Sequence, residues 1–229
     1  MATHYDIVHL TEVGTTQDEA AARFGRTGRP TLVVADRQVA GRGRQGRRWV
    51  QPDRAMFSSV AFGIDWATKH RTLVPLIAGL VVSESVGDAG GRPTALKWPN
   101  DIMVGRQKAG GVLVELDGNA ITVGCGLNLW WGNPIESATS VYDADPGPAA
   151  ALGLAGRWAT ALLAEIDRGA SQWRQADYVR ASATIGSDVE WDDGAGRAVA
   201  VDGSGALVVD TLDGVVTIHA GDVHMRGWR

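Results

Sequence analysis

The amino-acid sequence predicts a mixed α/β domain followed by a small β-barrel, and three observations lead to this expectation. Short β-branched runs alternate with helical patterns as far as about residue 181. Near residues 185–186 the character changes, and short strands then follow one another, separated by Asp-Gly turns at the regular spacing of a barrel. The length of 229 residues suits one large domain with a small appendage, so we expect domains at 1–184 and 185–229.

Hydrophobic patterns predict the elements of the first part. A strand at 7–10 precedes a helix whose N-cap we place at Thr16, because Thr16 and Glu19 have the spacing of a capping box. Further strands are expected at 31–35, 56–62, 112–116 and 120–129, and helices at 73–86, 149–166 and about 173–179. Two short strands flank the corner at 98–101, and a long surface loop covers 130–148. In the barrel, strands are expected at 189–191, 198–201, 206–209 and 215–218.

Composition indicates an ordinary globular protein, with 45% hydrophobic and 21% charged residues. The longest apolar run, 73–82, is too short to span a bilayer, and the first six residues lack the pattern of a signal peptide. The single cysteine excludes an internal disulfide and a cysteine-based zinc site. We therefore expect a cytoplasmic location and no membrane partner.

The segment 41–49 concentrates positive charge as no other part of the chain does. It contains four arginines, three glycines and no acid, and without these arginines the chain would have 18 basic against 26 acidic residues. Glycines let backbone N–H groups approach an anion, and arginine matches carboxylate and phosphate oxygens. A nucleic-acid arm and a solvated loop are the alternatives. The net charge of −4 and the pI near 5.7 argue against a nucleic-acid surface, and the predicted barrel, with eight acids and three arginines, does so too.

Three other stretches carry polar groups whose roles the residues alone leave open. The threonine-rich turn at 14–17 is a helix start that also offers donors to a polar ligand atom. Asn100 and Asp101 fit ordinary turn residues, and Lys108 before paired glycines is either a solvated lysine or a cation beside closely approached backbone. Cys125 fits a small buried hydrophobe, because no histidine lies near it in sequence to activate a thiol.

In this order the motifs resemble those of the biotin–protein ligases. The carrying segments are GTTQ at 14–17, GRGRQGRRW at 41–49, KWPND at 97–101, KAGGVLVE at 108–115 and GCGLNL at 124–129. The resemblance runs from about residue 7 to residue 229 and is weakest between 130 and 181. It implies a mixed-sheet catalytic domain of the biotin/lipoate-ligase type with an SH3-like C-terminal barrel. Thr15 and Gln17 stand where relatives often have serine and asparagine, and each keeps the donor type.

The family's activity is implied in two half-reactions. Biotin reacts with ATP to give biotinyl-5′-AMP and pyrophosphate, and a lysine of a biotin carboxyl carrier domain then takes the biotinyl group. The resemblance assigns catalysis to Lys108, Arg42 and Arg44, and a Mg²⁺ contact to Asp101. The biotin-binding residues that it implies are Thr15, Thr16, Gln17, Gln38, Gly41, Arg42, Gly43, Arg44, Lys108 and Gly111. The nucleotide-binding residues that it implies are Arg47, Trp49, Asn100, Lys108 and Asn128.

Two rival functions stay open at this stage. A lipoate–protein ligase or octanoyltransferase shares the superfamily, and a cysteine-dependent octanoyltransferase would need a reactive thiol. A binding protein without catalysis, such as a biotin sensor, would bind ligand without exchanging ATP and pyrophosphate. Many relatives begin with a DNA-binding helix-turn-helix, and we expect no repressor function because the catalytic pattern starts at the first strand. The resemblance also implies that the protein can dimerise through a sheet edge. The sequence contains no surface pattern from which the oligomeric state can be predicted.

Overall fold

The computed structural model describes residues 4–44, 49–135 and 138–227. A seven-stranded sheet forms the first part, in the order β1-β2-β3-β7-β6-β5-β4. Its strands are β1 (Asp6–Val13), β2 (Thr31–Gln38), β3 (Arg54–Gly63), β4 (Ala95–Lys97), β5 (Asp101–Val104), β6 (Gln107–Asp117) and β7 (Ala120–Trp130). β1 and β2 are parallel and the other pairs are antiparallel, so the sheet is mixed as predicted.

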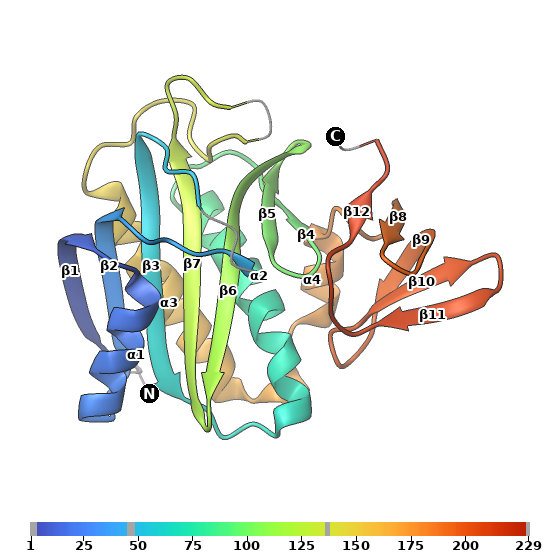
Figure 1. Ribbon diagram of the computed structural model, residues 1–229, viewed down its shortest axis with the longest axis horizontal. Helices are drawn as coiled ribbons and strands as arrows, with labels where there is room; N and C mark the ends of the chain where they lie inside the picture. The colour runs from blue at the N-terminus through green and yellow to red at the C-terminus, as the bar shows by residue number, and fades with distance from the viewer. Residues whose placement is uncertain (1–3, 45–48, 136–137, 228–229) are drawn as a thin grey trace.

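Helices cover the two faces of this sheet unequally (Figure 1). α2 (Val74–Asp88) and α3 (Ala150–Arg168) pack on one face, where Leu32 and Val34 point into the main core. α1 (Thr16–Thr27) packs on the other face over Val33, because side chains alternate along a strand. The rest of that second face, beyond the N-terminus of α1, is where the candidate site lies.

The C-terminal part is a five-stranded antiparallel sheet in the order β11-β10-β9-β8-β12. Its strands are β8 (Asp188–Trp191), β9 (Gly194–Val201), β10 (Leu207–Thr211), β11 (Gly214–Ile218) and β12 (His224–Met225). The short helix α4 (Gln175–Ala181) and the 3-10 helix η3 (Ala170–Gln172) connect the two parts. The predicted fold class is confirmed, although the sequence did not predict β12.

The two parts share a hydrophobic core. Trp98, from the corner between β4 and β5, is fully buried and packs in one cluster with Leu76 of α2 and Val189 of β8. Its Nε1 donates to the carbonyl of Gly205 at 2.9 Å, and its backbone N–H donates to Thr184 Oγ1 at 2.9 Å. The C-terminal sheet is thereby held beside the β4–β5 corner, while the domain boundary at 184 and 185 stays a prediction.

The N-cap predicted for α1 is wrong. The N-cap of α1 is Thr15, not Thr16, because Thr15 Oγ1 accepts the backbone N–H of Gln17 at 3.2 Å while Glu19 pairs with Arg23 instead of closing a capping box. The helix predicted at 73–86 is confirmed as α2, which begins at Val74 with a proline in its first turn and follows a 3-10 helix, η2 (Thr68–Leu73).

Candidate active site

A cavity of about 420 Å³ lies on the open face of the seven-stranded sheet. The N-terminus of α1, the loop after β2, the β4–β5 corner and the segment 222–224 surround it. The structure brings most of the residues predicted for the site to this cavity: Thr15, Thr16, Gln17, Gln38, Arg42, Gly43, Arg44, Trp49, Asn100, Asp101, Lys108, Gly111 and Asn128. Gly41 lies outside it, in a neighbouring depression, and Arg47 lies outside the described residues.

Small residues on three adjacent strands hollow the floor of the cavity. Gly111, Gly126 and Phe57 lie opposite one another on β6, β7 and β3, and the next row on the same face contains Gly124 and Ser59. A Cβ atom at Gly124 would come within 2.6 Å of Gln17 Oε1, and one at Gly126 within 3.3 Å of the Trp49 ring. These glycines are therefore needed for the close approach of the side chains above them.

The end of the cavity next to the N-terminus of α1 and the end of β2 is polar and uncharged. Gln38, at the end of β2, uses its Oε1 to accept the backbone N–H of Thr16 at 2.7 Å and the Thr16 hydroxyl at 3.1 Å. The Thr16 hydroxyl also lies 2.8 Å from Ser59 Oγ. Gln17 is 3% exposed, and its Oε1 is buried without a hydrogen-bond partner among the described residues. A buried acceptor without a partner costs free energy, so this end is suited to a ligand that supplies a donor.

The loop after β2 places two arginines at the side of the cavity. Arg42 donates to Asp18 Oδ1 at 2.6 Å and lies 3.6 Å from Glu115 Oε1. Arg44 donates to Asn100 Oδ1 at 3.0 Å and to the carbonyl of Gly221 at 3.1 Å. Since Gly221 belongs to the C-terminal part, this arginine connects the loop to both parts of the molecule.

Lys108 faces the cavity because β6 contains a bulge. Ile102 pairs with Gly110 whereas Met103 pairs with Lys108, so Ala109 is an extra residue in the strand. As a result Ala109 packs into the core beneath the sheet, and the Lys108 ammonium comes close to Gly111 on the cavity side. Lys108 Nζ lies 2.5 Å from Asp101 Oδ1, and Lys97 Nζ lies 3.8 Å from the other oxygen. Two ammonium groups thus share one carboxylate at this end.

Two buried polar atoms beside this cationic end have no hydrogen-bond partner among the described residues. They are Trp49 Nε1, a donor, and Asn128 Oδ1, an acceptor. The Asn128 Nδ2 donates to the carbonyl of Thr139 at 2.9 Å, which fixes the orientation of the amide. Asn100 differs, because its Nδ2 donates to the Val112 carbonyl while its Oδ1 accepts from Arg44. Trp49 and Asn128 are therefore better suited than Asn100 to bind a ligand directly. Asn100 instead holds the loop after β2 through Arg44.

Cys125 is not an activated thiol. It is 2% exposed and packs in the main core, and burial raises the pKa of the thiol well above its ordinary value. A neutral thiol is a poor nucleophile. Of the interpretations open for this residue, the small buried hydrophobe is confirmed.

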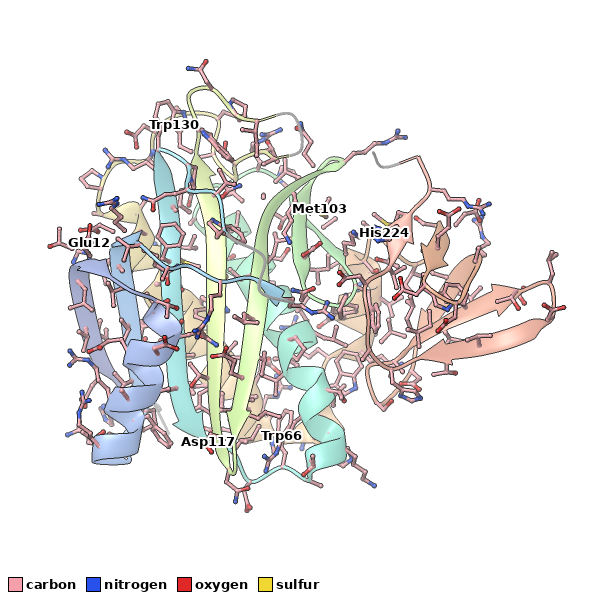
Figure 2. The ribbon with its side chains drawn as sticks, viewed as in Figure 1. Glu12, Trp66, Met103, Asp117, Trp130 and His224 are labelled. Carbon is pink, nitrogen blue, oxygen red and sulfur yellow. The ribbon has the colours of Figure 1, made fainter. Side chains whose placement is uncertain are left out.

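Sequence reasoning missed several residues of the cavity and its surroundings. Ser59, Asp222 and His224 line it, and Glu115 lies beside Gln17 and Arg42. Figure 2 labels His224, which belongs to β12 of the C-terminal sheet. None of these positions has a local signature, because strand pairing and the docking of the C-terminal sheet bring them to the site. Glu115 stands in the segment 108–115, but its neighbours in space cannot be read from that segment.

The described residues contain no group of three or more His, Cys, Asp or Glu side chains that could hold a metal ion. Among the helices in the described part of the chain, none is long and apolar enough to cross a membrane. The cationic side chains that line the cavity in the described structure are Lys97, Lys108, Arg42, Arg44 and His224 if it is protonated.

Comparisons with known proteins bear on this site. Residues 11–128 match the family described as the Biotin/lipoate A/B protein ligase family, and residues 194–226 match the Biotin protein ligase C terminal domain. A biotin–[acetyl-CoA-carboxylase] ligase of Mycobacterium tuberculosis is 33% identical, with 95% of this chain and 88% of that protein covered. The bifunctional ligase/repressor BirA of Bacillus spizizenii is 26% identical, with 85% and 66% covered.

Solved structures agree with the sequence matches. The biotin protein ligase of Aquifex aeolicus in complex with biotin and ATP is 26% identical, with 96% of this chain and 98% of that chain covered and a TM-score of 0.75. The Leishmania major ligase in complex with biotin is 25% identical, with 94% and 98% covered and a TM-score of 0.67. Similarity of this extent covers both the cavity and the C-terminal sheet.

Proposed function

Because this chain belongs to the Biotin/lipoate A/B protein ligase family, we propose that its cavity joins biotin to ATP and passes the biotinyl group to a carrier protein. The chain is a biotin–protein ligase by its family, as the sequence motifs predicted. The observation that carries the proposal is that one cavity has a neutral polar end at Gln17 and a cationic end at Lys108. Biotin has a neutral cyclic urea at one end and a carboxylate at the other, so its two ends match those of the cavity.

The urea ring of biotin would occupy the end formed by α1 and β2. Urea N–H groups are donors, and Gln17 Oε1 is a buried acceptor without a partner among the described residues. The hydroxyl of Thr15 and the paired Thr16 and Gln38 supply further polar groups to the ring. The carboxylate would then extend along Gly111 toward Lys108, with Arg42, Gly43 and Arg44 at its side.

In the first half-reaction a carboxylate oxygen of biotin attacks the α-phosphorus of ATP. The bond from that phosphorus to the oxygen bridging to the β-phosphate breaks, and pyrophosphate leaves with the bonding electrons. Two anions must approach each other, and negative charge grows on the α-phosphate oxygens. We assign the neutralisation of this charge to Lys108, which exchanges part of its bond to Asp101 for bonds to the two reacting groups, with Arg42 and Arg44 assisting.

The nucleotide would lie beside Trp49 and Asn128. The Trp49 ring lies over Gly126 with its Nε1 buried, and the Asn128 amide is fixed with its oxygen unpaired among the described residues. A purine offers both donors and acceptors on its edge, so it can satisfy these two atoms. Asn100 supports the site through Arg44, and Arg47 keeps its predicted phosphate contact as a proposal from the family resemblance alone.

In the second half-reaction the neutral amine of a carrier lysine attacks the acyl carbon of biotinyl-5′-AMP. The bond from that carbon to the phosphate oxygen breaks, AMP leaves, and the nitrogen loses its proton to solvent. The acceptor must enter from the open side of the cavity, where Asp222 and His224 of the C-terminal part line the wall. We propose that the carrier is the biotin carboxyl carrier domain of acetyl-CoA carboxylase or a related carboxylase.

Magnesium would arrive with ATP as part of the substrate. Asp101, the residue predicted to contact the ion, is engaged by Lys108 and Lys97, and the described residues add no carboxylate cluster around it. The described residues alone therefore do not fit a resident Mg²⁺ site. A homodimer would use the edge at β1, the outermost strand of the large sheet. Analytical ultracentrifugation would measure whether the protein is a monomer or a dimer in solution.

ATP–pyrophosphate exchange tests the proposal. Biotin should support exchange of labelled pyrophosphate into ATP, whereas lipoate at the same concentration should not, because lipoate has no N–H to offer Gln17. Exchange with lipoate and none with biotin would favour the lipoate ligase instead. Binding of biotin without any exchange would indicate a non-catalytic sensor.

A further inference from the structure

The amide of Gln17 is held in one orientation. Its Nε2 donates to Glu115 Oε2 at 3.1 Å and to the backbone carbonyl of Thr122 at 3.3 Å. Both partners are acceptors only, so the reversed amide would place its oxygen against two other oxygens. The nitrogen must therefore face Glu115, and the oxygen must face the cavity.

Glu115 supplies the stronger of these two contacts. Its carboxylate is charged and lies closer than the carbonyl of Thr122, and hydrogen bonds to charged acceptors are the stronger ones. The same carboxylate lies 3.6 Å from the guanidinium of Arg42, which limits its own movement. Glu115 is itself half-exposed at the cavity's edge, so it acts on a ligand through Gln17.

We propose that Glu115 is a positioning residue that sets the ligand specificity of this end of the cavity. By holding the Gln17 nitrogen, it presents the oxygen to the ligand and selects a ligand that donates an N–H there, as a cyclic urea does. Gly124 leaves the space for this oxygen, since a Cβ there would come within 2.6 Å of it. The inference rests on the proposed function, because the urea of biotin supplies that N–H.

The test compares Glu115→Ala and Glu115→Gln with wild type. Exchange kinetics give kcat and the KM values for biotin and ATP, and calorimetry gives the Kd for biotin without turnover. Asp117→Ala is the matched control, because Asp117 lies two residues further on the same face of β6 and is exposed (Figure 2). A Gln17→Ala variant and the Gln17→Ala/Glu115→Ala double variant complete a double-mutant cycle, which measures the interaction free energy between Gln17 and Glu115.

Glu115→Ala should raise the KM and Kd for biotin about tenfold, which corresponds to about 1.4 kcal/mol. The kcat and the KM for ATP should change less than about twofold, and Glu115→Gln, which keeps an acceptor oxygen, should stay within about threefold of wild type. In the Gln17→Ala background, Glu115→Ala should have no further effect on biotin.

Two results would overturn the role of Glu115. One is a Glu115→Ala variant that binds biotin as the Asp117→Ala control does, and the other is an equal loss of affinity in the Gln17→Ala background. A wild-type protein that binds biotin but exchanges no pyrophosphate would contradict the proposed function alone, and the Kd values would still decide about Glu115. A wild-type protein that binds no biotin would overturn both.

Discussion

Replacing Lys108 with alanine removes the ammonium that we place between the biotin carboxylate and the α-phosphate. This ammonium donates to Asp101 Oδ1 at 2.5 Å, and the Lys108 side chain is 42% exposed. The substitution leaves Lys97 as the remaining partner of Asp101 and does not touch the core, because Ala109 fills the core position of the bulge. The variant should therefore fold and bind biotin through the opposite end of the cavity.

The magnitude follows from the charge interaction. Two unit charges 4 Å apart interact by about 4 kcal/mol at an effective dielectric constant near 20. The partial exposure of Lys108 and the neutralising effect of Asp101 weaken this interaction, and we take roughly half of it as the loss in the transition state. About 2 kcal/mol corresponds to roughly a thirtyfold fall in the rate of adenylation.

The assay is the initial rate of ATP–pyrophosphate exchange at saturating biotin and ATP. Lys69→Ala is the matched control, because Lys69 is an exposed lysine in η2, remote from the cavity. We expect the control to retain wild-type exchange while Lys108→Ala loses at least tenfold. Exchange by Lys108→Ala at the control's rate would refute the role of Lys108.

Three further outcomes follow from other parts of the structure. Cys125→Ser should keep exchange and transfer within about twofold of wild type, because the thiol is buried and neutral; a tenfold loss would restore the cysteine-dependent alternative. Burial raises the pKa of both the Cys125 thiol and the Tyr178 phenol, so the unfolded chain loses these protons first as pH rises. The free energy of unfolding should then fall above about pH 8.5 through the thiol and above about pH 10 through the phenol, by at most about 1.4 kcal/mol per pH unit for each group. Urea titrations should show a smaller fall for Tyr178→Phe, and equal slopes would contradict this cause. Asp222→Asn removes an ion pair to Arg44 at 3.3 Å that is worth about 1 kcal/mol. Amide exchange over 41–44 should accordingly become about fivefold faster, and an unchanged rate would show that Asp222 does not hold the loop.

The sequence predicted what depends on neighbours along the chain. The short β-branched run at 31–35 correctly indicated a buried strand, and the alternation at 56–62 correctly indicated the strand that follows it. Helical spacing at 149–166 indicated α3 despite two glycines. Arg42 and Arg44 of the arginine-rich segment line one cavity together with Asn128, the residue that follows the small residues of 124–126. These features are local, so their physical consequences can be read without knowing the register of the sheet.

The features that the sequence did not reveal depend on pairing between distant segments. The bulge at Ala109 exists only in register with β5, yet it directs Lys108 into the cavity. The contact between Glu115 and Gln17 spans 98 residues, and the bond from Arg44 to Gly221 spans 177. Residues so far apart meet only when the sheet and the C-terminal part have assembled, and no spacing rule covers them.

A crystal structure of the protein with biotinyl-5′-AMP tests the central claim most directly. The account predicts that Lys108 Nζ lies within about 3.2 Å of the acyl-phosphate oxygens, that Gln17 Oε1 accepts a urea N–H, and that the loop carrying Arg42 and Arg44 covers the ligand. An adenylate bound with Lys108 still held only by Asp101, and with both arginines directed into solvent, would contradict it.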